Sequence, residues 1–301
     1  MTDPKRDPPS ISSGLAFAMS AFMIWGASPV YWKALNNVPA FETVVHRVVW
    51  SFLFLLPLIV FQHRWKAFTA ALFDWKTLLI MLVTSLFVSI NWLIYIWAIH
   101  RQYLLQASLG YYINPLVNVL LGTLFLKERL RKAQTIAVAL AAMGVLYLTV
   151  FYGRFPWISV ALAFSFGFYG LIRKMAPVGP LIGLTIETLL LAVPAVAYLW
   201  YVEHSGRAAF LHLGIQTDLM LTGTALVTAL PLLFFNLGAK RLRLSTVGFL
   251  QYITPTSMFL IAVFFFKEPF SSVQVISFIL IWAALAIYST DSALYFNRIE
   301  R

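Results

Sequence analysis

The stretch RQYLLQASLGYYINPLVNVLLGTLFLKERLRKAQTIAVAL (101–140) aligns without a gap with a later stretch, RLRLSTVGFLQYITPTSMFLIAVFFFKEPFSSVQVISFIL (241–280). Twelve of the 40 aligned positions are identical. Apolar composition raises the chance of such matches, but the shared residues include Tyr, Pro and the Lys-Glu pairs at 127–128 and 267–268. Because solubility in lipid does not require these residues, the chain is predicted to contain one structural unit twice.

The repeat extends toward the N-terminus of each unit. With the register changed by one residue, Pro39 aligns with Pro180 and His46 aligns with Glu187. Each unit contains five apolar runs that are too long for the strands of a membrane β-barrel and do not alternate polar with apolar residues. The ten runs predicted as helices are 13–32, 41–61, 76–99, 105–126, 133–152, 155–172, 180–201, 218–238, 245–266 and 272–290.

The composition places these helices in a membrane. Of the 301 residues, 61% are hydrophobic and 11% charged, whereas soluble domains carry about 25% charged residues. At about 20 residues per span, this length accommodates ten spans and no sizeable soluble domain. The absence of cysteine excludes disulfides, thiolate catalysis and Cys-ligated metals. The net charge of +11 does not indicate nucleic-acid binding, because the basic residues lie in short gaps between apolar runs.

The positions of Lys and Arg predict the orientation, since cytoplasmic loops are enriched in both. If the N-terminus is cytoplasmic, sixteen basic residues lie in cytoplasmic segments: Lys5, Arg6, Arg64, Lys66, Lys76, Lys127, Arg129, Arg131, Lys132, Arg173, Lys174, Lys240, Arg241, Arg243, Arg298 and Arg301. Five lie in outer segments: Lys33, Arg101, Arg154, Arg207 and Lys267. Both termini are therefore expected in the cytoplasm.

An odd number of helices per unit inverts the second unit in the membrane. We expect a cytoplasmic tail (1–12), a first five-helix repeat (13–152), a second, inverted repeat (153–290) and a second cytoplasmic tail (291–301). Two inverted units that exchange conformations open a central cavity to each side in turn, with the substrate site near the bilayer midplane. The fold therefore indicates transport by alternating access.

Aromatic and amide side chains within the spans suit a cavity for a mostly apolar solute that carries a few polar groups. Most such residues pack against other helices in any membrane protein, so only some are expected to touch substrate. The candidate cavity residues, with two ionisable ones, are Trp25, His46, Trp50, Asn91, Trp92, Tyr95, Tyr111, Asn114, Tyr169, Glu187, Asn236 and Gln251.

Ionisable residues within spans are costly and usually face the protein interior. His46 and Glu187 occupy equivalent places in the two units and are the candidates for proton coupling. A buried structural pair or network is the alternative, and a functional role is favoured over it. Arg47 is expected to be structural, bonded to Glu42, to a helix C-terminal carbonyl or to lipid headgroups.

Pro115 and Pro255 lie near the middle of equivalent spans. Each lacks an N–H and leaves the carbonyl four residues earlier without its helical partner. Either the neighbouring helices satisfy an ordinary kink or both residues are hinges beside the cavity. Their matched positions favour hinges.

No phosphate-binding loop, metalloprotease or nucleophile-elbow motif is present, and the five histidines are too dispersed to form a metal site. We expect no catalytic residue, cofactor or metal. A membrane enzyme acting on lipids and a passive channel are the alternatives. The first would need a polar cluster near one membrane face, and the second a continuous polar stripe.

Several stretches resemble the RarD branch of the EamA transporters, within the drug/metabolite transporter superfamily. They are FMIWGASPVYWKAL (22–35), ETVVHRVVWSF (42–52), INWLIYIWAI (90–99), ASLGYYINPLVNVLLGTLFLKERL (107–130) and LSTVGFLQYITPTSMFL (244–260). The similarity spans about residues 13–290, and the His-Arg pair at 46–47 and GYYINPL (110–116) are typical of this branch.

The resemblance implies ten helices, a cavity lined by the first four and by the sixth to ninth, and peripheral fifth and tenth helices. It also implies a multi-pass permease of the bacterial inner membrane. The branch is often associated with chloramphenicol sensitivity, and relatives export amino acids and other metabolites. The expected partners are a small-molecule substrate and membrane lipids, with the chain as a monomer or weak homodimer.

Overall fold

The computed structural model describes residues 11–35, 37–100, 104–152, 157–261, 264 and 271–299. Within these ranges the backbone forms helices and no strand, so the all-helical prediction is confirmed. The helices are α1 (Ile11–Ala34), α2 (Ala40–Phe61), α3 (Trp65–Phe73), α4 (Trp75–His100), α5 (Leu104–Phe125), α6 (Lys132–Tyr152), α7 (Trp157–Met175), α8 (Pro180–His204), α9 (Ile215–Arg241), α10 (Leu244–Leu250), α11 (Ile253–Leu260) and α12 (Ser272–Ile299).

The helices follow the predicted apolar runs with three differences. The ninth run, 245–266, is broken at Gln251 and Tyr252 into α10 and α11. The short α3 was not predicted, and α12 continues through 291–299, where a tail was expected. By length and composition, seven of the described helices can cross a membrane, while α5 and α12 contain shorter apolar segments. The chain is therefore a multi-pass membrane protein.

Local contacts explain two of these differences. Asp74 lies between α3 and α4, and its Oδ2 accepts hydrogen bonds from the Thr77 hydroxyl at 2.6 Å and the Thr77 N–H at 3.0 Å. These bonds cap α4 and hold the pKa of the Asp74 carboxyl below its usual value. Beyond the apolar part of α12, Arg131 donates to Asp291 at 2.7 Å and lies 4.2 Å from the Tyr295 ring. That anchor fixes the last turns of α12 to the segment before α6.

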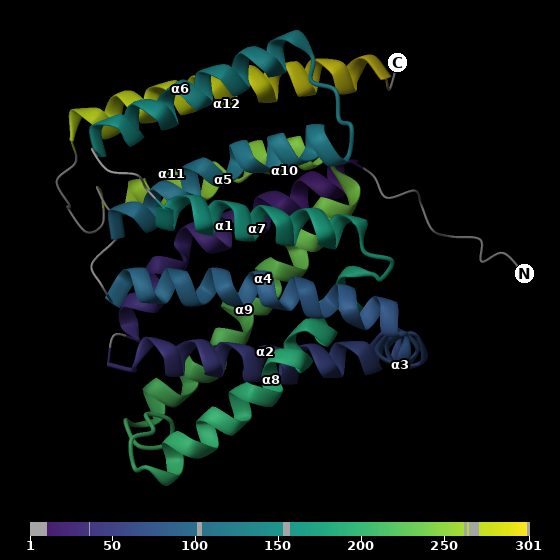
Figure 1. Cartoon of the computed structure of the whole chain (residues 1–301), viewed down its shortest axis with the longest axis vertical. Coiled ribbons are helices and arrows are strands. Elements are labelled where there is room, and N and C mark those ends of the chain that lie inside the picture. The colour runs from purple at the N-terminus through teal and green to yellow at the C-terminus, as the bar shows by residue number, and fades with distance from the viewer. Residues whose placement is uncertain are drawn as a thin grey trace, which may run out of the picture.

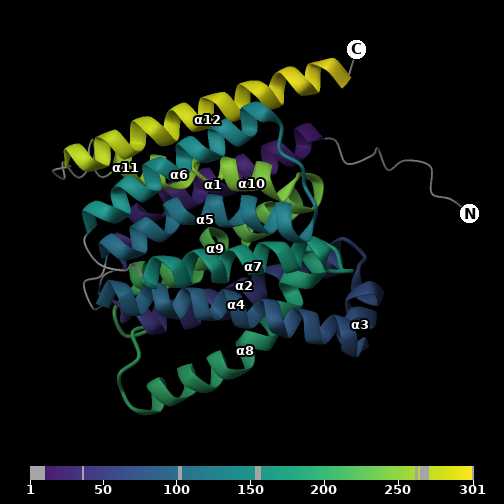
Figure 2. The ribbon, with the colours of Figure 1, turned by 45° about the horizontal axis from the view of Figure 1, so that its top comes forward.

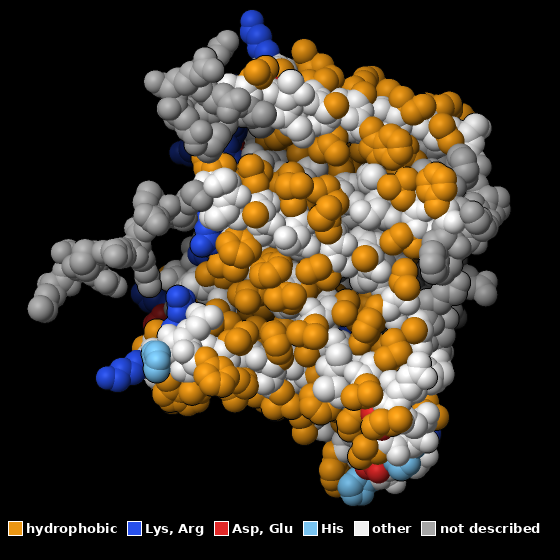
Figure 3. All heavy atoms as spheres, turned by 180° about the vertical axis from the view of Figure 1, so that it is seen from behind, with side chains coloured by type: hydrophobic (Ala, Val, Ile, Leu, Met, Phe, Trp, Pro, Cys, Tyr) orange, Lys and Arg blue, Asp and Glu red, His pale blue; other side chains and the backbone are white. Residues whose placement is uncertain are grey.

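The helices lie side by side in a bundle (Figures 1 and 2). At one edge α6 and α12 form a pair, α8 lies at the opposite edge, and α9 crosses the bundle obliquely. The start of α1, the short α3 and the end of α12 lie at the same end of the bundle. We call this the inner end and the opposite one the outer end. Figure 3 shows apolar side chains over the broad face and Lys and Arg along one edge.

The helix contacts repeat between the halves. If α1, α2, α4, α5 and α6 correspond to α7, α8, α9, α10–α11 and α12, most of the larger contacts have a counterpart. The pair α1–α9 corresponds to α7–α4, the pair α2–α9 to α8–α4, and the pair α5–α7 to α11–α1. The pairs α2–α8, α5–α10 and α6–α12 join equivalent elements. Most helices therefore have equivalent neighbours in the two halves; α7–α9 and the contacts of α3 are the exceptions among the larger contacts of the described helices.

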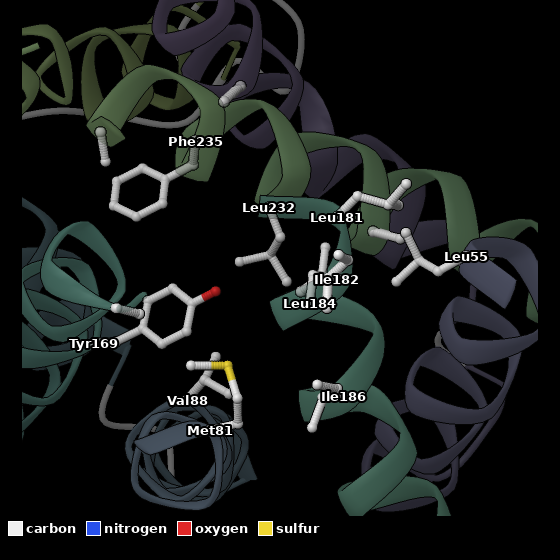
Figure 4. Packing of buried hydrophobic residues seen from close by; sticks show 14 of the residues in the cluster. Leu55, Met81, Val88, Tyr169, Leu181, Ile182, Leu184, Ile186, Leu232 and Phe235 are labelled. Carbon is white, nitrogen blue, oxygen red and sulfur yellow. The ribbon is translucent and has the colours of Figure 1, made fainter. Parts of the chain in front are cut away.

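Apolar packing fills the inner half of the bundle where α4, α7, α8 and α9 meet (Figure 4). Tyr169 from α7 and Phe235 from α9 stack with their rings 6.2 Å apart, and Met81 from α4 lies below Tyr169 in this view. Leu184 from α8 and Leu232 from α9 belong to the same buried cluster. This half of the bundle is closed.

Candidate functional site

A cavity lies between the two halves of the bundle, with a water-accessible volume of about 100 Å³. One buried water needs only about 10–15 Å³ by this measure, so the cavity has room for a small solute. Its lining comes from α1, α2, α4, α5, α7, α9, α11 and the α10–α11 break. The lining residues are Trp25, Ser28, Trp32, Arg47, Asn91, Trp92, Tyr95, Gly110, Tyr111, Asn114, Leu162, Phe166, Thr228, Leu232, Gln251 and Thr254.

The cavity extends from the middle of the bundle toward its outer end. Trp32 is near the outer end of α1, Arg47 lies two turns from the outer end of α2, and Tyr95 lies in the outer part of α4. The deepest members, Thr228 and Leu232, are midway along α9. The cavity therefore occupies the half opposite the closed packing of Figure 4.

Aromatic rings form much of the wall. Trp25 packs against Phe166, with ring centroids 5.7 Å apart in an edge-to-face arrangement. Tyr95 and Tyr111 face each other at 6.0 Å, also edge to face. Aromatic rings bring large apolar surfaces together with a few polar groups. This wall favours a solute with a flat or apolar body.

The amide side chains of the wall are held in place by hydrogen bonds. Asn91 donates to the Leu162 carbonyl and to the Ser165 hydroxyl at 2.9 and 3.0 Å, and Asn114 donates to the Ala163 carbonyl at 3.1 Å. Asn118, behind the wall, donates to the Gln251 side-chain oxygen at 2.7 Å. These bonds join the two halves of the bundle and fix the shape of the inner end of the cavity. We call this cavity the chamber and its inner end the chamber floor.

Arg47 brings a positive charge to the cavity. Its Nε donates to the Thr228 hydroxyl at 2.9 Å, and its guanidinium carbon lies 4.6 Å from the Trp32 ring centroid and 4.8 Å from that of Trp92. The expected bond to Glu42 is absent, because Glu42 accepts a hydrogen bond from the Ala209 N–H at 2.7 Å. Of the three partners expected for Arg47, Glu42 is therefore wrong, and the Arg47 side chain lines the cavity.

His46 lies beside the cavity, in a buried group at the outer end. Its Nδ1 is 3.2 Å from the Trp50 indole nitrogen, which donates to it, and its Nε2 is 3.9 Å from Glu42. The Phe210 ring packs against His46 at 5.1 Å. This group ties α2 to the loop between α8 and α9, so His46 and Trp50 do not belong to the cavity wall in this conformation.

A second buried group lies in the closed inner half. Arg173 and Glu187 form an ion pair with Nε and Oε1 3.4 Å apart, both nearly inaccessible, but the two atoms are not aligned for a hydrogen bond. Tyr169 donates to Glu187 at 3.4 Å and accepts a hydrogen bond from Asn236 at 3.0 Å. Arg173 also donates to the Pro180 carbonyl at 3.0 Å. We call Tyr169, Arg173, Glu187 and Asn236 the inner cluster.

The two prolines differ in their surroundings. Pro115 lies inside the unbroken helix α5, whereas Pro255 lies in the first turn of α11, just after the break at Gln251 and Tyr252. A methyl group on Gly248 of α10 would lie 2.7 Å from the Pro115 carbonyl oxygen, so the two backbones are in close contact there. The helix break and this contact lie at the chamber floor.

Seven of the twelve predicted cavity residues line the cavity, and five lie elsewhere. The seven are Trp25, Asn91, Trp92, Tyr95, Tyr111, Asn114 and Gln251. The other five are divided between the outer-end group, with His46 and Trp50, and the inner cluster, with Tyr169, Glu187 and Asn236. As the resemblance implied, α6 and α12 are peripheral, but α8 adds no residue to the wall among the described residues.

Sequence reasoning missed several wall residues. Ser28 and Trp32 follow Trp25 at positions three and seven, which places all three on one helix face. That spacing could have identified them. Thr228 and Thr254 carry no such signal, because threonine is common in membrane helices. Within the described residues, no group of three His, Asp or Glu side chains could hold a metal ion.

The fold and the chamber define a class: a polytopic membrane protein with a polar and aromatic cavity between two similar halves. A sequence profile described as the EamA-like transporter family matches residues 12–150 and again 156–290. The chain therefore belongs to the EamA-like transporter family and, within the drug/metabolite transporter superfamily, to the branch that includes the RarD proteins.

Individual relatives agree over nearly the full length. A protein of Vibrio cholerae named as an uncharacterized transporter is 47% identical over 285 residues, covering 95% of this chain and 94% of its own. The protein RarD of Escherichia coli K12 is 42% identical over 295 residues, covering 97% and 98%. A solved crystal structure shares the fold with a TM-score of 0.72 at 19% identity, covering 92% of this chain and 98% of its own.

Proposed function

We propose that this protein is a secondary transporter that moves a small amphipathic metabolite or drug by alternating access. Its two five-helix units (13–152 and 153–290) cross the bacterial inner membrane in opposite orientations, giving ten spans with both termini in the cytoplasm. The observation that carries the proposal is the asymmetry of the chamber. A cavity is present in the outer half, while the equivalent place in the inner half is filled.

Three observations support the inverted arrangement. The family profile matches the chain twice, once in each unit. Most of the larger helix contacts keep an equivalent partner when the units are exchanged. The start of α1 and the end of α12 lie at one end of the bundle, where most of the Lys and Arg of the loops are also found. Cytoplasmic loops carry such an excess of positive charge.

Equivalent residues support a difference between the two halves. In the register that aligns His46 with Glu187, Ser28 corresponds to Tyr169, and Trp32 corresponds to Arg173. The first of each pair lines the cavity, and the second fills the inner cluster. This conformation is therefore outward-facing. In the inward-facing one, the inner cluster would separate and the outer cavity would collapse.

The inner cluster gives proton coupling a physical basis. Glu187 is paired with Arg173 while the inner half is closed. When that half opens, the pair separates and Glu187 gains access to cytoplasmic water, where it can exchange a proton. His46 is the equivalent position in the outer half and would play the corresponding part on the other side. We propose export driven by this exchange.

The test is counterflow in proteoliposomes with radiolabelled amino acids, aromatic metabolites and chloramphenicol. A transporter gives saturable uptake of at least one solute, stimulated by the same unlabelled solute inside and by a pH gradient. Flux that rises linearly with concentration, without counterflow, would indicate a channel and contradict the proposal.

Glu187→Gln tests the coupling. The variant should insert normally and retain counterflow, but it should lose the stimulation by the pH gradient. Glu203→Gln is the matched control, since Glu203 is near the outer end of the same helix, more than half exposed and paired with His212. If Glu187→Gln keeps the full response to the gradient, Glu187 has no part in the coupling.

A further inference from the structure

We infer that the chamber binds a small aromatic or otherwise apolar carboxylate, with the guanidinium of Arg47 as the group that binds its anionic end. The inference names the substrate class of the chamber and so rests on the proposed function. Its test measures binding alone and does not depend on transport.

The first argument is charge. Among the described wall residues, Arg47 is the charged one, and no Asp or Glu joins it. No described acidic side chain lies within 4.0 Å of Arg47. Glu42, on the same helix, accepts a hydrogen bond from the Ala209 N–H and faces His46 instead. A cation at this depth in a membrane protein is costly unless it is compensated, and in this chamber a ligand is free to supply the opposite charge.

The second argument is the unused hydrogen-bonding capacity. A guanidinium has five N–H donors in a rigid fork. Arg47 uses Nε on Thr228, and no hydrogen bond within the described part of the chain involves its Nη1 or Nη2. Two terminal nitrogens of arginine match the two oxygens of a carboxylate. The fork is therefore held at one edge and available at the other.

The third argument is rigidity. The faces of Trp32 and Trp92 lie 4.6 and 4.8 Å from the guanidinium carbon, within the range of cation–π attraction. These two rings and Thr228 hold the guanidinium by contacts from α1, α4 and α9. The two rings and the hydroxyl are uncharged, so they do not neutralise the guanidinium. The positive group is therefore already positioned to bind an anion.

The shape of the chamber selects the rest of the ligand. Trp25, Tyr95, Tyr111 and Phe166 form aromatic walls around about 100 Å³. In other proteins, an apolar cavity of about 150 Å³ is large enough to bind benzene. The chamber is smaller than that cavity, so it limits the solute to about a single ring, and a cationic amine would be repelled by Arg47.

Benzoate, benzamide and benzylamine test this inference, because they share a ring and differ in charge. The full-length protein in an uncharged detergent is titrated with each compound at neutral pH. Binding is followed by the unfolding temperature and by tryptophan fluorescence, to which Trp32 and Trp92 contribute. Benzoate should bind roughly tenfold or more tightly than benzamide, because hydrogen bonds to a charged group are stronger than neutral ones. Benzylamine should not bind.

Arg47→Gln should abolish the preference for benzoate over benzamide, and Arg47→Lys should keep part of it. Arg207→Gln is the matched control, since Arg207 also lies over an aromatic ring, that of Tyr201, but at the exposed end of the molecule. If Arg47→Gln fails to fold, Arg47→Lys and the wild-type comparison of the three probes decide the question.

Equal binding of benzoate and benzamide, absence of benzoate binding, or an unchanged preference in Arg47→Gln would each overturn the inference. Competition of benzoate binding by added phosphatidylglycerol would also overturn it, because the site would then belong to a lipid headgroup. Tight binding of benzamide or benzylamine instead of benzoate would refute the inference that the ligand is an anion. It would leave the proposed transport function intact.

Discussion

Arg173 shows at the scale of single residues how a charge is kept inside this bundle. Its side chain is 1% exposed and lies against Glu187, Pro180 and Met81. The space for it is provided by Gly183, where a methyl group would overlap Nη1 and lie 2.7 Å from Cζ. A glycine one turn before Glu187 is thus required by a side chain from a different helix.

Gly183→Ala is expected to displace Arg173 and break the pair that closes the inner half. Overpacking of this kind costs about 1–3 kcal/mol, so the unfolding temperature should fall. The response of counterflow to a pH gradient should weaken as well. Both effects are measured on purified and reconstituted protein.

Gly179→Ala is the control for that substitution. A methyl group there meets nothing closer than Nη1 of Arg64 at 3.8 Å, an ordinary contact. A loss of stability as large in Gly179→Ala as in Gly183→Ala would show that the Arg173 contact is not the cause.

Residue partners were the part of the site that sequence could not predict. Residue type identified aromatic and amide residues of the wall, because they stand out in apolar helices. The partner of Glu42 is the backbone N–H of Ala209, in a loop 167 residues away, and no sequence pattern marks it. Glu42 was therefore one of three partners expected for Arg47, which faces the chamber instead.

At the scale of helices, the crossing of α5 and α10 lies where the two halves meet at the chamber floor. Gly248 of α10 lies against the backbone of Pro115 in α5. The helix is interrupted three residues later, at Gln251. Sequence predicted each apolar run because about 20 residues must be apolar to cross lipid. It did not predict the break, since Gln251 and Tyr252 lie within an otherwise continuous apolar run.

Gly248→Ala should separate α5 from α10 and slow counterflow, because a methyl group cannot fit 2.7 Å from a backbone oxygen. We expect a reduced maximal rate with a smaller change in solute affinity. The measurement is the initial counterflow rate per mole of folded protein over a range of solute concentrations.

Gly144→Ala supplies the comparison. Gly144 is also a contact glycine, because a methyl group added there would lie 3.1 Å from the Ser277 carbonyl oxygen, but it joins the peripheral pair α6 and α12. The substitution should lower stability and spare the rate. Equal losses of rate in both variants would assign the effect to general loosening of the bundle.

At the scale of the whole molecule, the repeat fixes which helices are neighbours but not which half is open. Equivalent positions carry different residues, such as Ser28 against Tyr169, so the two halves fill their space differently. A single pair shows only that the larger side chain, here Tyr169, fills more space in its own half. The conformation itself depends on how all the pairs pack together, which the sequence does not reveal.

The central claim is that the two halves of the chamber open in turn. The chain contains no cysteine, so single cysteines report without background. Ser28 lines the outer cavity, and Thr188 is buried in the inner half at the position equivalent to Arg47. Each hydroxyl bonds to a carbonyl of its own helix, so cysteine should be tolerated at both sites.

The decisive measurement is the reaction of Ser28→Cys and Thr188→Cys with a membrane-impermeant maleimide, applied from each side of oriented proteoliposomes during counterflow. The account predicts that Ser28→Cys reacts from the outer side and Thr188→Cys from the inner side. A solute gradient that favours one state should raise one rate as it lowers the other. Reaction of both cysteines from the same side, or rates that do not change in opposite directions while solute is transported, would contradict it.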